Sequence, residues 1–413
     1  MNDSRDLAIA AAAERYTPDM AQFLRDMISI PSESGGERAV VERVRVEMER
    51  AGFDEIKIDR MGNILGRIGR GSTVIALDAH LDTVGVGDLS TWRCDPYAGE
   101  VREGVIYGRG ASDQEGGMAA ALYGARIVKE LGLGGDVELW VTGTIMEEDC
   151  DGLCWQHILK EGVLKPDVVV ITEPTNLAVY RGHRGRMEIE VRTQGRSCHG
   201  SAPERGVNAI YKMAPILADI ERYNADLAAG ADAFLGKGSV AVSAIRSTSP
   251  SLCAVADSCT IHLDRRLTRG ETLEHAVAGI AALPGVRAAG ATVTVLDYER
   301  ASYTGLNLAT KKYYPTWVLE EDHPAVAAAE RAAAKALGRT PEVGRWIFST
   351  NGVATAGMFG IPTVGFGPGD EIFAHTPEDQ CPIEHLTRAA RFYAAFPGLF
   401  LEAAGRAPEW RRA

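Results

Sequence analysis

The chain has 413 residues, of which 46 % are hydrophobic and 24 % charged, and its formal net charge is −12. This composition is typical of a soluble globular protein and, at about 150 residues per domain, predicts two or three domains. A general nucleic-acid binder needs a basic surface, so the acidic balance argues against that class. The longest apolar runs fall short of the roughly 18 residues of a membrane span.

The first sixteen residues and the cysteines bear on the compartment. The apolar run at 7–13 has acidic neighbours and lacks the basic flank and the length of a signal peptide, so we expect a helix there. The seven cysteines include no CxxC pair, which predicts reduced thiols rather than a disulfide framework or a zinc ribbon. We therefore expect a cytoplasmic protein.

Strands alternate with helices in the first 184 residues. Helical spacing of apolar residues fills most of 18–52. Further helices are expected at about 117–131 and 152–160, and strands at 56–58, 64–68, 74–77, 137–145 and 165–172. Apolar strands that alternate with helices predict an α/β sheet buried on both faces.

The pattern changes after residue 184. Residues 187–195 alternate apolar and polar side chains, as a half-exposed strand does. Helices are then expected at about 206–222 and 271–283, and strands near 238–247, 253–264 and 291–298. This βαββαβ order is the ferredoxin-like arrangement. The α/β character returns with a helix at 324–337 and a strand at 362–366. We predict one α/β domain, 1–184 plus 300–413, interrupted by an inserted domain, 185–299.

His80 and Asp82 stand at the end of a predicted apolar strand, in LDAHLDT. Residues two apart on an extended chain point to the same side, and at the carboxyl edge of an α/β sheet that side faces the usual ligand crevice. An imidazole with a nearby carboxylate suits a metal ligand and the group that orients it. A solvated strand end is the alternative interpretation.

Other acidic residues and one histidine occupy comparable positions. Asp113 lies in the glycine-rich loop YGRGASDQEGG, where a carboxylate can bridge two cations or simply cap a helix. Glu147 and Glu148 follow the strand VELWVTGTIM, where one can ligate a metal while the other accepts a proton, or both can be exposed loop acids. Glu173 in TEPTN and His375 in FAHTPED also follow strands. Solvated residues would not gather at strand ends so consistently.

Together these five separated motifs, in this order, resemble peptidase family M20, the co-catalytic zinc hydrolases that include acetylornithine deacetylase, succinyl-diaminopimelate desuccinylase, aminoacylases and glutamate carboxypeptidases. The quoted stretches are most similar to YgeY-type hydrolases of that family. The resemblance covers essentially the whole chain. It implies a mixed-sheet zinc-hydrolase catalytic domain whose inserted ferredoxin-like domain serves as a lid and a dimerisation surface.

The resemblance implies a role for each motif residue. His80 and Glu173 would bind one metal and Glu148 and His375 the other, and Asp113, joined to Gln114 by a cis peptide bond, would bridge the two. Asp82 would orient His80, and Glu147 would be the general base that activates a metal-bridging water. We expect two divalent ions, zinc above all, with Mn²⁺ or Co²⁺ able to substitute. The four positive charges of two such ions balance the negative charges of the three ligand carboxylates and of Glu147.

The resemblance also implies substrate-binding residues. His199, in SCHGSAPERGVNAI, would reach the partner subunit's site of a homodimer, and Asn208 of the same segment would bind substrate. Arg266, in DRRLTRGE, would bind a substrate carboxylate. Where relatives have a Gly-Gly-Thr-Asp-like loop this chain has STNGVAT, so we expect Thr350, Asn351 and Gly352 to line the pocket.

We therefore expect an amidohydrolase of deacylase or carboxypeptidase type, for example a deacetylase, that cleaves a small N-acyl amino acid or related amide bearing a carboxylate. The resemblance makes Glu173 favour that branch, because the aminopeptidase and dipeptidase branch tends to have Asp at its position, and the carbamoylase branch usually has His there. An N-carbamoyl hydrolase or a dipeptidase is the alternative. A more remote alternative is a catalytically silent binding or regulatory homologue. Such a protein would be expected to lack one of the metal-ligand residues or the general base. No nucleic-acid or membrane partner is expected.

Overall fold

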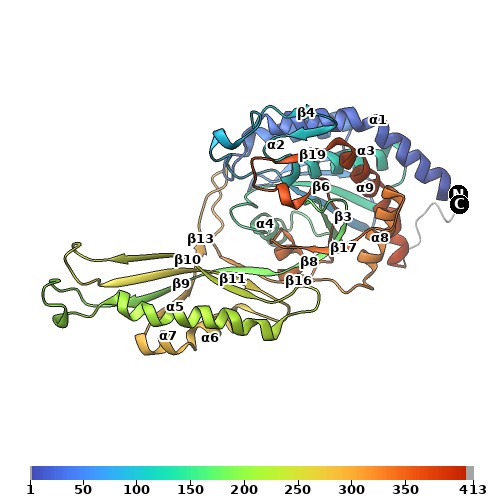
Figure 1. Ribbon diagram of the computed structural model, residues 1–413. Coiled ribbons are helices and arrows are strands. Elements are labelled where there is room, and N and C mark those ends of the chain that lie inside the picture. Colours follow the sequence, from blue (N-terminus) through green and yellow to red (C-terminus); the bar gives the residue numbers. More distant parts are fainter. Residues whose placement is uncertain (1, 406–413) are drawn as a thin grey trace.

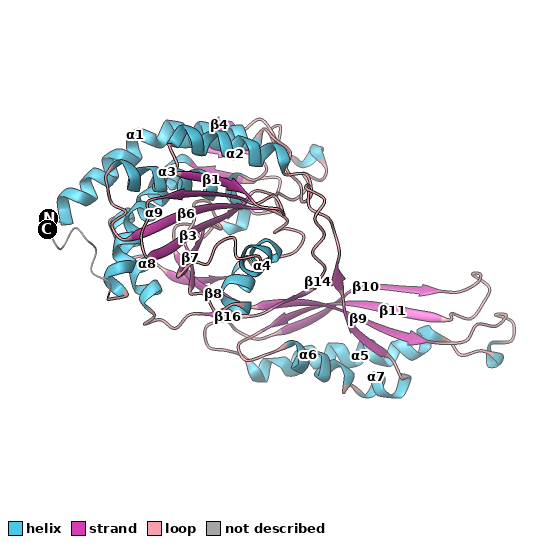
Figure 2. Cartoon of the chain, turned by 180° about the vertical axis from the view of Figure 1, so that it is seen from behind, coloured by secondary structure: helices cyan, strands magenta, loops and turns pink. Residues whose placement is uncertain are grey.

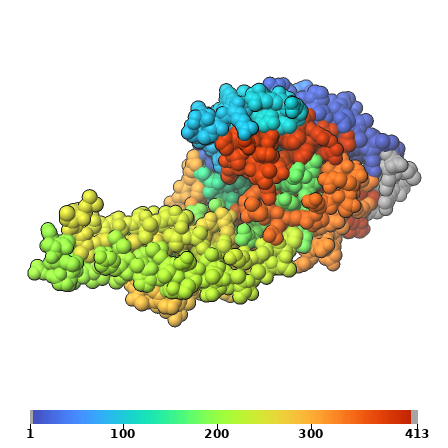
Figure 3. All heavy atoms as spheres, in the orientation of Figure 1, coloured from blue at the N-terminus to red at the C-terminus, as the bar shows by residue number. Residues whose placement is uncertain are grey.

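The computed structural model describes residues 2–405 as a rounded body from which an elongated arm projects (Figure 1). The body contains a large mixed sheet between helices, and the arm contains a smaller antiparallel sheet with helices on one face. In the space-filling view the outer half of the arm stands clear of the body (Figure 3). No helix within residues 2–405 combines the length and the apolarity that a membrane crossing needs.

The helices are α1 (Asn2–Ile28), α2 (Arg38–Ala51), α3 (Gly116–Glu130), α4 (Leu153–Lys160), α5 (Ala209–Asp226), α6 (Leu273–Ala281), α7 (Pro284–Ala289), α8 (Pro324–Leu337) and α9 (Ile383–Ala403). The strands are β1 (Glu55–Ile58), β2 (Ile64–Ile68), β3 (Thr73–His80), β4 (Glu100–Arg102), β5 (Val105–Tyr107), β6 (Val137–Thr144), β7 (Val168–Ile171), β8 (Val179–His183), β9 (Gly185–Gln194), β10 (Ser239–Thr248), β11 (Ser258–Leu267), β12 (Thr292–Val295), β13 (Asp297–Tyr298), β14 (Thr310–Lys311), β15 (Tyr313–Tyr314), β16 (Trp317–Val318), β17 (Val343–Trp346), β18 (Thr363–Gly365) and β19 (Gln380–Pro382).

The strands of the body's sheet follow the order β1-β2-β6-β3-β7-β18-β8-β16, with β17 beside β8. The four central strands, β6, β3, β7 and β18, run parallel to one another. Successive side chains of β3 enter different cores: Ile75 and Leu77 pack with α1, α2, α3, α8 and α9, whereas Ala76 packs with Trp155 of α4 and with Trp317. Burial on both faces explains the continuous apolar runs of these strands.

The arm has the predicted strand–helix–strand–strand–helix–strand order, with α7 as an additional short helix after α6. Its sheet follows the order β10-β11-β9-β12, and β15 pairs with β9. Met187, Ile189 and Val191 of β9 are buried with residues of α5, α6 and α7, which all lie on one side of this sheet (Figure 2). Their neighbours in the alternation, such as Arg186 and Glu188, point to the opposite, polar face. The predicted fold class, α/β with an inserted ferredoxin-like unit, is confirmed.

Candidate active site

The candidate ligands come together because four adjacent parallel strands end at one edge of the sheet. His80 is the last residue of β3, and Glu147 and Glu148 follow the end of β6 by three and four residues. Glu173 follows β7, and His375 lies in the loop beyond β18. The prediction that these side chains share one edge of the sheet therefore agrees with their positions.

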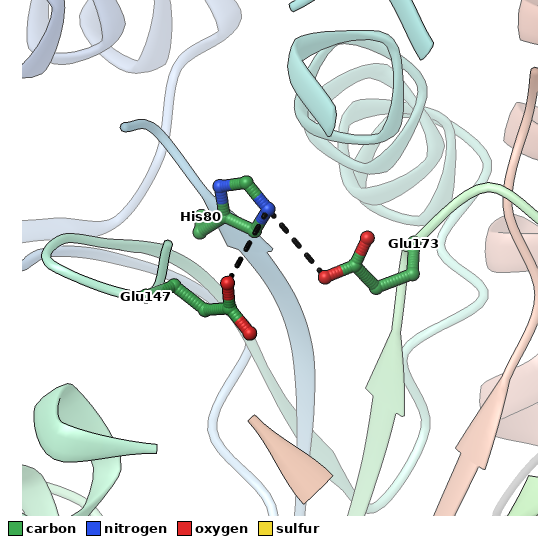
Figure 4. Close-up of side chains that lie close together, drawn as sticks. All are labelled: His80, Glu147 and Glu173. Carbon is green, nitrogen blue, oxygen red and sulfur yellow. Dashed lines mark ion pairs between the residues drawn. The ribbon is translucent and has the colours of Figure 1, made fainter. Parts of the chain in front are cut away.

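His80 is buried, and its Nε2 atom faces three carboxylates. This atom lies 3.1 Å from Asp113 Oδ1, 3.5 Å from Glu173 Oε1 and 3.9 Å from Glu147 Oε2. Figure 4 shows the approach of the two glutamates to the ring from separate loops. On the other side of the ring, Nδ1 donates a hydrogen bond of 2.8 Å to the backbone carbonyl of Asp82, which leaves Nε2 free to act as a ligand.

Asp113 lies between the two histidines. Its Oδ1 atom faces His80, and its Oδ2 atom lies 3.2 Å from His375 Nε2. The same His375 nitrogen is 2.9 Å from Glu148 Oε2. The peptide bond between Asp113 and Gln114 is cis, as the resemblance implies. A carboxylate with one oxygen toward each of two imidazoles is placed as a bridging ligand must be.

Asp379 fixes the loop that carries Asp113. Its buried carboxylate accepts hydrogen bonds from the backbone N–H of Gly110 at 2.8 Å and from the backbone N–H and hydroxyl of Ser112 at 2.9 and 2.8 Å. Arg109 donates a further bond to it at 3.2 Å. Sequence reasoning did not single out Asp379, although it lies in the HTPED segment only four residues after His375.

Burial and close charges shift the pKa values of the groups in this cluster. Burial, and next the charge of Asp113, raises the pKa of Glu148 to about 7 and that of Glu173 to about 8. Burial acts against ionisation of Asp113 as well, but hydrogen bonds from His375 and His80 outweigh it and lower the pKa of Asp113. Hydrogen bonds to Asp113 and Glu148 raise the pKa of His375 to about 10. Without another cation, the protonated imidazoles thus stabilise the negative charge of Asp113, whereas burial and repulsion favour the neutral forms of Glu148 and Glu173.

The donor set fits divalent metal ions. One oxygen each of Glu147, Glu148 and Glu173 is buried without a hydrogen-bond partner in the described chain. Ligand atoms of His80, Glu147 and Glu173, and those of His80, Asp113 and Glu148, lie within 4.8 Å of one another. Unpartnered buried carboxylates are costly unless a cation binds them, and the mixed imidazole and carboxylate set suits zinc.

A cavity of about 380 Å³ opens above the cluster and is lined by both parts of the molecule. Arg186 of β9 and Arg266 of β11 line it and are register partners in the arm's sheet. Arg266 donates to Asp264 at 2.8 and 3.0 Å, and Arg186 donates to Asp151 at 3.1 Å. Arg266 was among the predicted residues. Arg186 was not, because only the cross-strand register places it opposite Arg266.

The predicted pocket residues 350–352 lie beneath the cavity wall rather than among the residues that line it. Thr350 contacts His183 through its hydroxyl at 3.1 Å, and Asn351 donates to Asp78 at 2.9 Å. Gly352 packs under Trp317, where a Cβ atom would approach the indole to 2.4 Å. The side chains that line the cavity from this segment are Phe348 and Ser349. Substrate binding by residues 350–352 stays a prediction.

His199 and Asn208 lie beyond the outer end of β9. At roughly 3.3 Å per residue, Gln194 at that end is on the order of 25 Å from Arg186 at the cavity. His199 is exposed, and its Nδ1 atom accepts hydrogen bonds from the backbone N–H and the hydroxyl of Ser201 at 3.1 and 2.7 Å. Asn208 caps α5 by accepting from the backbone N–H of Ile210. Neither lines the cavity of its own chain.

Known proteins resemble this chain in sequence and in fold. The model of the family described as Peptidase family M20/M25/M40 matches residues 76–397. The uncharacterized protein YgeY of Escherichia coli (strain K12) is 54 % identical over 389 residues, which cover 94 % of this chain and 96 % of that protein. A succinyl-diaminopimelate desuccinylase of Cereibacter sphaeroides is 29 % identical over 292 residues, 65 % of this chain and 74 % of the relative.

A solved structure shows the same fold. A dinuclear metal-binding peptidase of the M20 family from Bacillus subtilis superposes with a TM-score of 0.70 at 15 % identity, over 94 % of this chain and 99 % of that one. The fold, the buried cluster and the relatives define the class of the protein as a hydrolase of amide bonds. The chain belongs to peptidase family M20/M25/M40.

Proposed function

We propose that this protein hydrolyses the amide bond of a small N-acyl amino acid, or a related amide, with the help of two divalent metal ions, zinc above all. The observation that carries the proposal is the buried cluster of unpartnered carboxylates and imidazoles, which shares one cavity with two arginines. The desuccinylases among the relatives, which are named for the removal of an acyl group, support the deacylase type.

Each metal ligand keeps the role that the resemblance implies. His80 and Glu173 would hold one ion, Glu148 and His375 the other, and Asp113 both. Bound there, the ions would supply Lewis acidity, which lowers the pKa of water and polarises a carbonyl oxygen. Mn²⁺ or Co²⁺ can occupy the same donor set.

Glu147 is placed to transfer protons. It is buried, it lines the cavity, and its Oε1 atom has no hydrogen-bond partner in the described chain. In the proposed reaction this carboxylate accepts a proton from the attacking water and donates it to the amine nitrogen that leaves. The carboxylate of Asp82 accepts a hydrogen bond of 3.1 Å from the backbone N–H of Glu147 and so holds this residue in place.

The two arginines support a substrate that carries a carboxylate. Like charges directly opposite each other in a sheet repel, so a pair such as Arg186 and Arg266 is better tolerated with anions nearby. Asp151 and Asp264 supply part of that charge, and the side chain of Arg266 is still 28 % exposed. A substrate carboxylate can bind it from the cavity. A dipeptide also carries this group, so a dipeptidase is the second candidate, ahead of an N-carbamoyl hydrolase.

We also propose a homodimer formed through the arm, with residues 185–299 as the inserted domain and 1–184 plus 300–413 as the catalytic domain. In support, the buried core of the arm runs from Met187 to Val295. The outer strand β10 is exposed along nearly its whole length, which leaves an edge that a second copy can cover. A partner would also bring His199 to a cavity that its own chain does not let it reach.

The seven cysteines are free thiols, which supports a reducing compartment such as the cytoplasm.

One experiment tests the reaction itself. The protein is stripped of metal, reloaded with Zn²⁺, Mn²⁺ or Co²⁺, and offered N-acetyl, N-succinyl and N-carbamoyl amino acids and dipeptides. We expect metal-dependent release of amine from an N-acyl amino acid, and an increased KM when the carboxylate of that substrate is replaced by a carboxamide. Absence of turnover with every amide and every metal would contradict the proposal.

A further inference from the structure

Two further acidic residues, Asp149 and Asp151, follow Glu147 and Glu148 in the loop after β6. Within residues 2–405, the groups of side chains able to hold a metal include neither of them. Each is instead bound by a residue at one of the places where the chain passes between the body and the arm. The chain enters the arm at β9 and first leaves it after β13, which lies where the two parts meet (Figure 1).

Asp149 is bound from the side where the chain leaves the arm. The hydroxyl of Tyr298, the last residue of β13, donates a hydrogen bond of 3.0 Å to Asp149 Oδ2. Arg300, two residues further along, forms an ion pair with the same oxygen. Its guanidinium also lies against the body, because a Cβ atom on Gly35 would approach Arg300 Nη2 to 3.2 Å. Arg300 therefore joins the arm's exit, the body and the loop.

Asp151 is bound from the side where the chain enters the arm. Arg186 of β9 donates to Asp151 Oδ2 at 3.1 Å, and the hydroxyl of Ser349 donates to the same oxygen at 2.6 Å. The guanidinium of Arg186 lies over the ring of Tyr314, its register partner on β15, at 4.6 Å from the ring centroid. These contacts fix the guanidinium, and with it the far end of the loop.

Holding Asp149 also holds Glu148, because consecutive Cα atoms are joined at a spacing of about 3.8 Å. A metal site tolerates changes of only about 0.2 Å in its ligand distances, so a small displacement of the loop matters there. The ion pair itself is 51 % exposed at Arg300 and 33 % exposed at Asp149. Such pairs add little to the stability of a fold. The effect of this pair should therefore appear in the site and not in the unfolding midpoint.

We propose that Arg300 and Arg186 are positioning residues that tie the loop of the proposed base to the arm, one through Asp149 and the other through Asp151. The alignment of the base and of its neighbouring metal ligand then depends on where the arm stands. This rests on the proposed function, in which the loop supplies both groups. The arm thus acts on the reaction of its own chain from outside the cavity as well as from its wall.

The test reverses the charges of the exposed pair, since two reversals can be combined in one protein. Arg300→Asp brings two carboxylates together, Asp149→Arg brings two guanidiniums together, and the double variant restores an ion pair of opposite sense. Groups that orient metal ligands affect affinity or activity by about 10- to 100-fold. We expect each single variant to lose about 10-fold in kcat on the best amide and in the affinity for one Zn²⁺ ion, at the low end of that range. The double variant should regain most of both.

The KM of that amide should stay near the wild-type value, because Arg300 is not among the described residues that line the cavity. Tyr298→Phe removes only the hydroxyl that Asp149 accepts and should lose a smaller part of the same two quantities. Thermal unfolding midpoints close to that of the wild type show that each variant is folded.

Lys311→Asp is the matched control. Lys311 pairs at 2.8 Å with Asp297, the neighbour of Tyr298 on β13, and both side chains are about half exposed. The substitution reverses one charge of an exposed ion pair on the same connection without altering a contact to the loop. It should keep the wild-type kcat and Zn²⁺ affinity.

The outcomes separate this inference from the function on which it rests. If Arg300→Asp keeps the wild-type kcat and Zn²⁺ affinity, if Lys311→Asp loses as much, or if the folded double variant regains neither, the positioning role is overturned while the proposed function stands. If the metal-loaded wild type cleaves no amide of the panel, the proposed function fails. The Zn²⁺ titrations of the same variants then still decide whether Arg300 positions the loop.

Discussion

The carboxylate of Asp82 accepts a hydrogen bond from the backbone N–H of Glu147 at 3.1 Å, and a second from that of Glu148 at 3.0 Å. The hydroxyl of Ser34 donates a third at 2.6 Å. The backbone carbonyl of Asp82 meanwhile accepts from His80 Nδ1 at 2.8 Å, whereas its carboxylate is 3.7 Å from that nitrogen. Asp82 thus orients His80 with its backbone and positions the loop of the proposed base with its side chain.

Asp82→Asn should weaken metal binding by about 10- to 100-fold, the range typical of groups that orient metal ligands. The two carboxylate oxygens of Asp82 accept from two backbone N–H groups and a hydroxyl, but the amide of Asn has only one oxygen that can accept. The loop that carries Glu147 and Glu148 should therefore shift. Isothermal titration of the metal-free protein with Zn²⁺ measures the effect. Ser34→Ala removes only one of the three donors and should weaken metal binding less than Asp82→Asn does. Equal affinities for wild type and Asp82→Asn would contradict this role.

Glu147→Gln should keep its metal and lose turnover by roughly 10²- to 10⁴-fold, the range associated with a general acid–base group. The amide keeps the size of the side chain but cannot accept and return a proton. The measurements are kcat on the best amide of the panel and the metal content of the same preparation. A variant with normal metal content and full activity would remove Glu147 from the proposed reaction.

The positions of the metal-ligand candidates could be predicted because each follows its own strand in the sequence. His80, Asp113, Glu148, Glu173 and His375 are short polar interruptions after apolar runs, and parallel strands bring such interruptions to one edge. Most predicted helices and strands also agree with the structure to within a few residues; for example, the helix expected at 324–337 is α8, Pro324–Leu337.

The residues that were missed depend on contacts that sequence spacing does not reveal. Arg186 reaches the cavity through its cross-strand register with Arg266, 80 residues later in the chain, and Asp379 acts on a loop more than 260 residues earlier. Helix α9, Ile383–Ala403, was not predicted. It contains Pro397, and Gly398 follows, two residues that normally interrupt a helical pattern. Packing against α3 and α8 in the body's core offsets that preference.

His183 should make stability depend on pH. Its Nε2 atom accepts hydrogen bonds from Trp317 at 2.7 Å and from the backbone N–H of Thr350 at 3.1 Å, so the buried ring is held neutral. Burial lowers the pKa of His183 to about 4. Because the unfolded chain binds the proton more readily, with a pKa near 6.5, the stabilisation is complete above about pH 6.5 and is lost as the pH falls toward 4.

The size of the pH effect on stability follows from the lowered pKa of His183. Between pH 7 and pH 5 the His183 contribution to the free energy of unfolding should fall by roughly 2 kcal/mol. His183→Gln has no group that titrates there, so the stability gap between wild type and variant should narrow by that amount. Urea unfolding of both metal-free proteins at the two pH values measures it. A gap that stays constant would show that His183 does not titrate in this range.

The proposed homodimer predicts complementation between two inactive proteins. His199→Ala and Glu147→Gln should each be inactive alone, for lack of the partner's histidine and of the base respectively. In a mixed dimer the His199→Ala subunit keeps its own Glu147 and receives an intact His199 from its partner. Co-refolded mixtures should therefore show activity that neither parent has. An inactive mixture that contains mixed dimers would place His199 outside the partner's site.

The exposed edge of the arm gives an independent test of the same dimer. Ile245 lies on β10 with 55 % of its surface exposed, and a charge on such an edge opposes pairing with a second strand. Ile245→Lys should sediment as a monomer where the wild type sediments as a dimer, and it should lose activity without loss of metal. A wild-type protein that is monomeric and fully active would contradict the proposal that His199 of one subunit acts in the active site of its partner.

The central claim is that the cluster around Asp113 holds two divalent ions. The most direct measurement is the number of Zn²⁺ ions bound per chain at equilibrium, by titration of the stripped protein and metal analysis of the product. We predict about two per chain, falling to about one in His375→Ala, which lacks a ligand of only one of the two ions, while His80, Glu173 and Asp113 still hold the other. A wild-type chain that binds one ion or none would contradict the account.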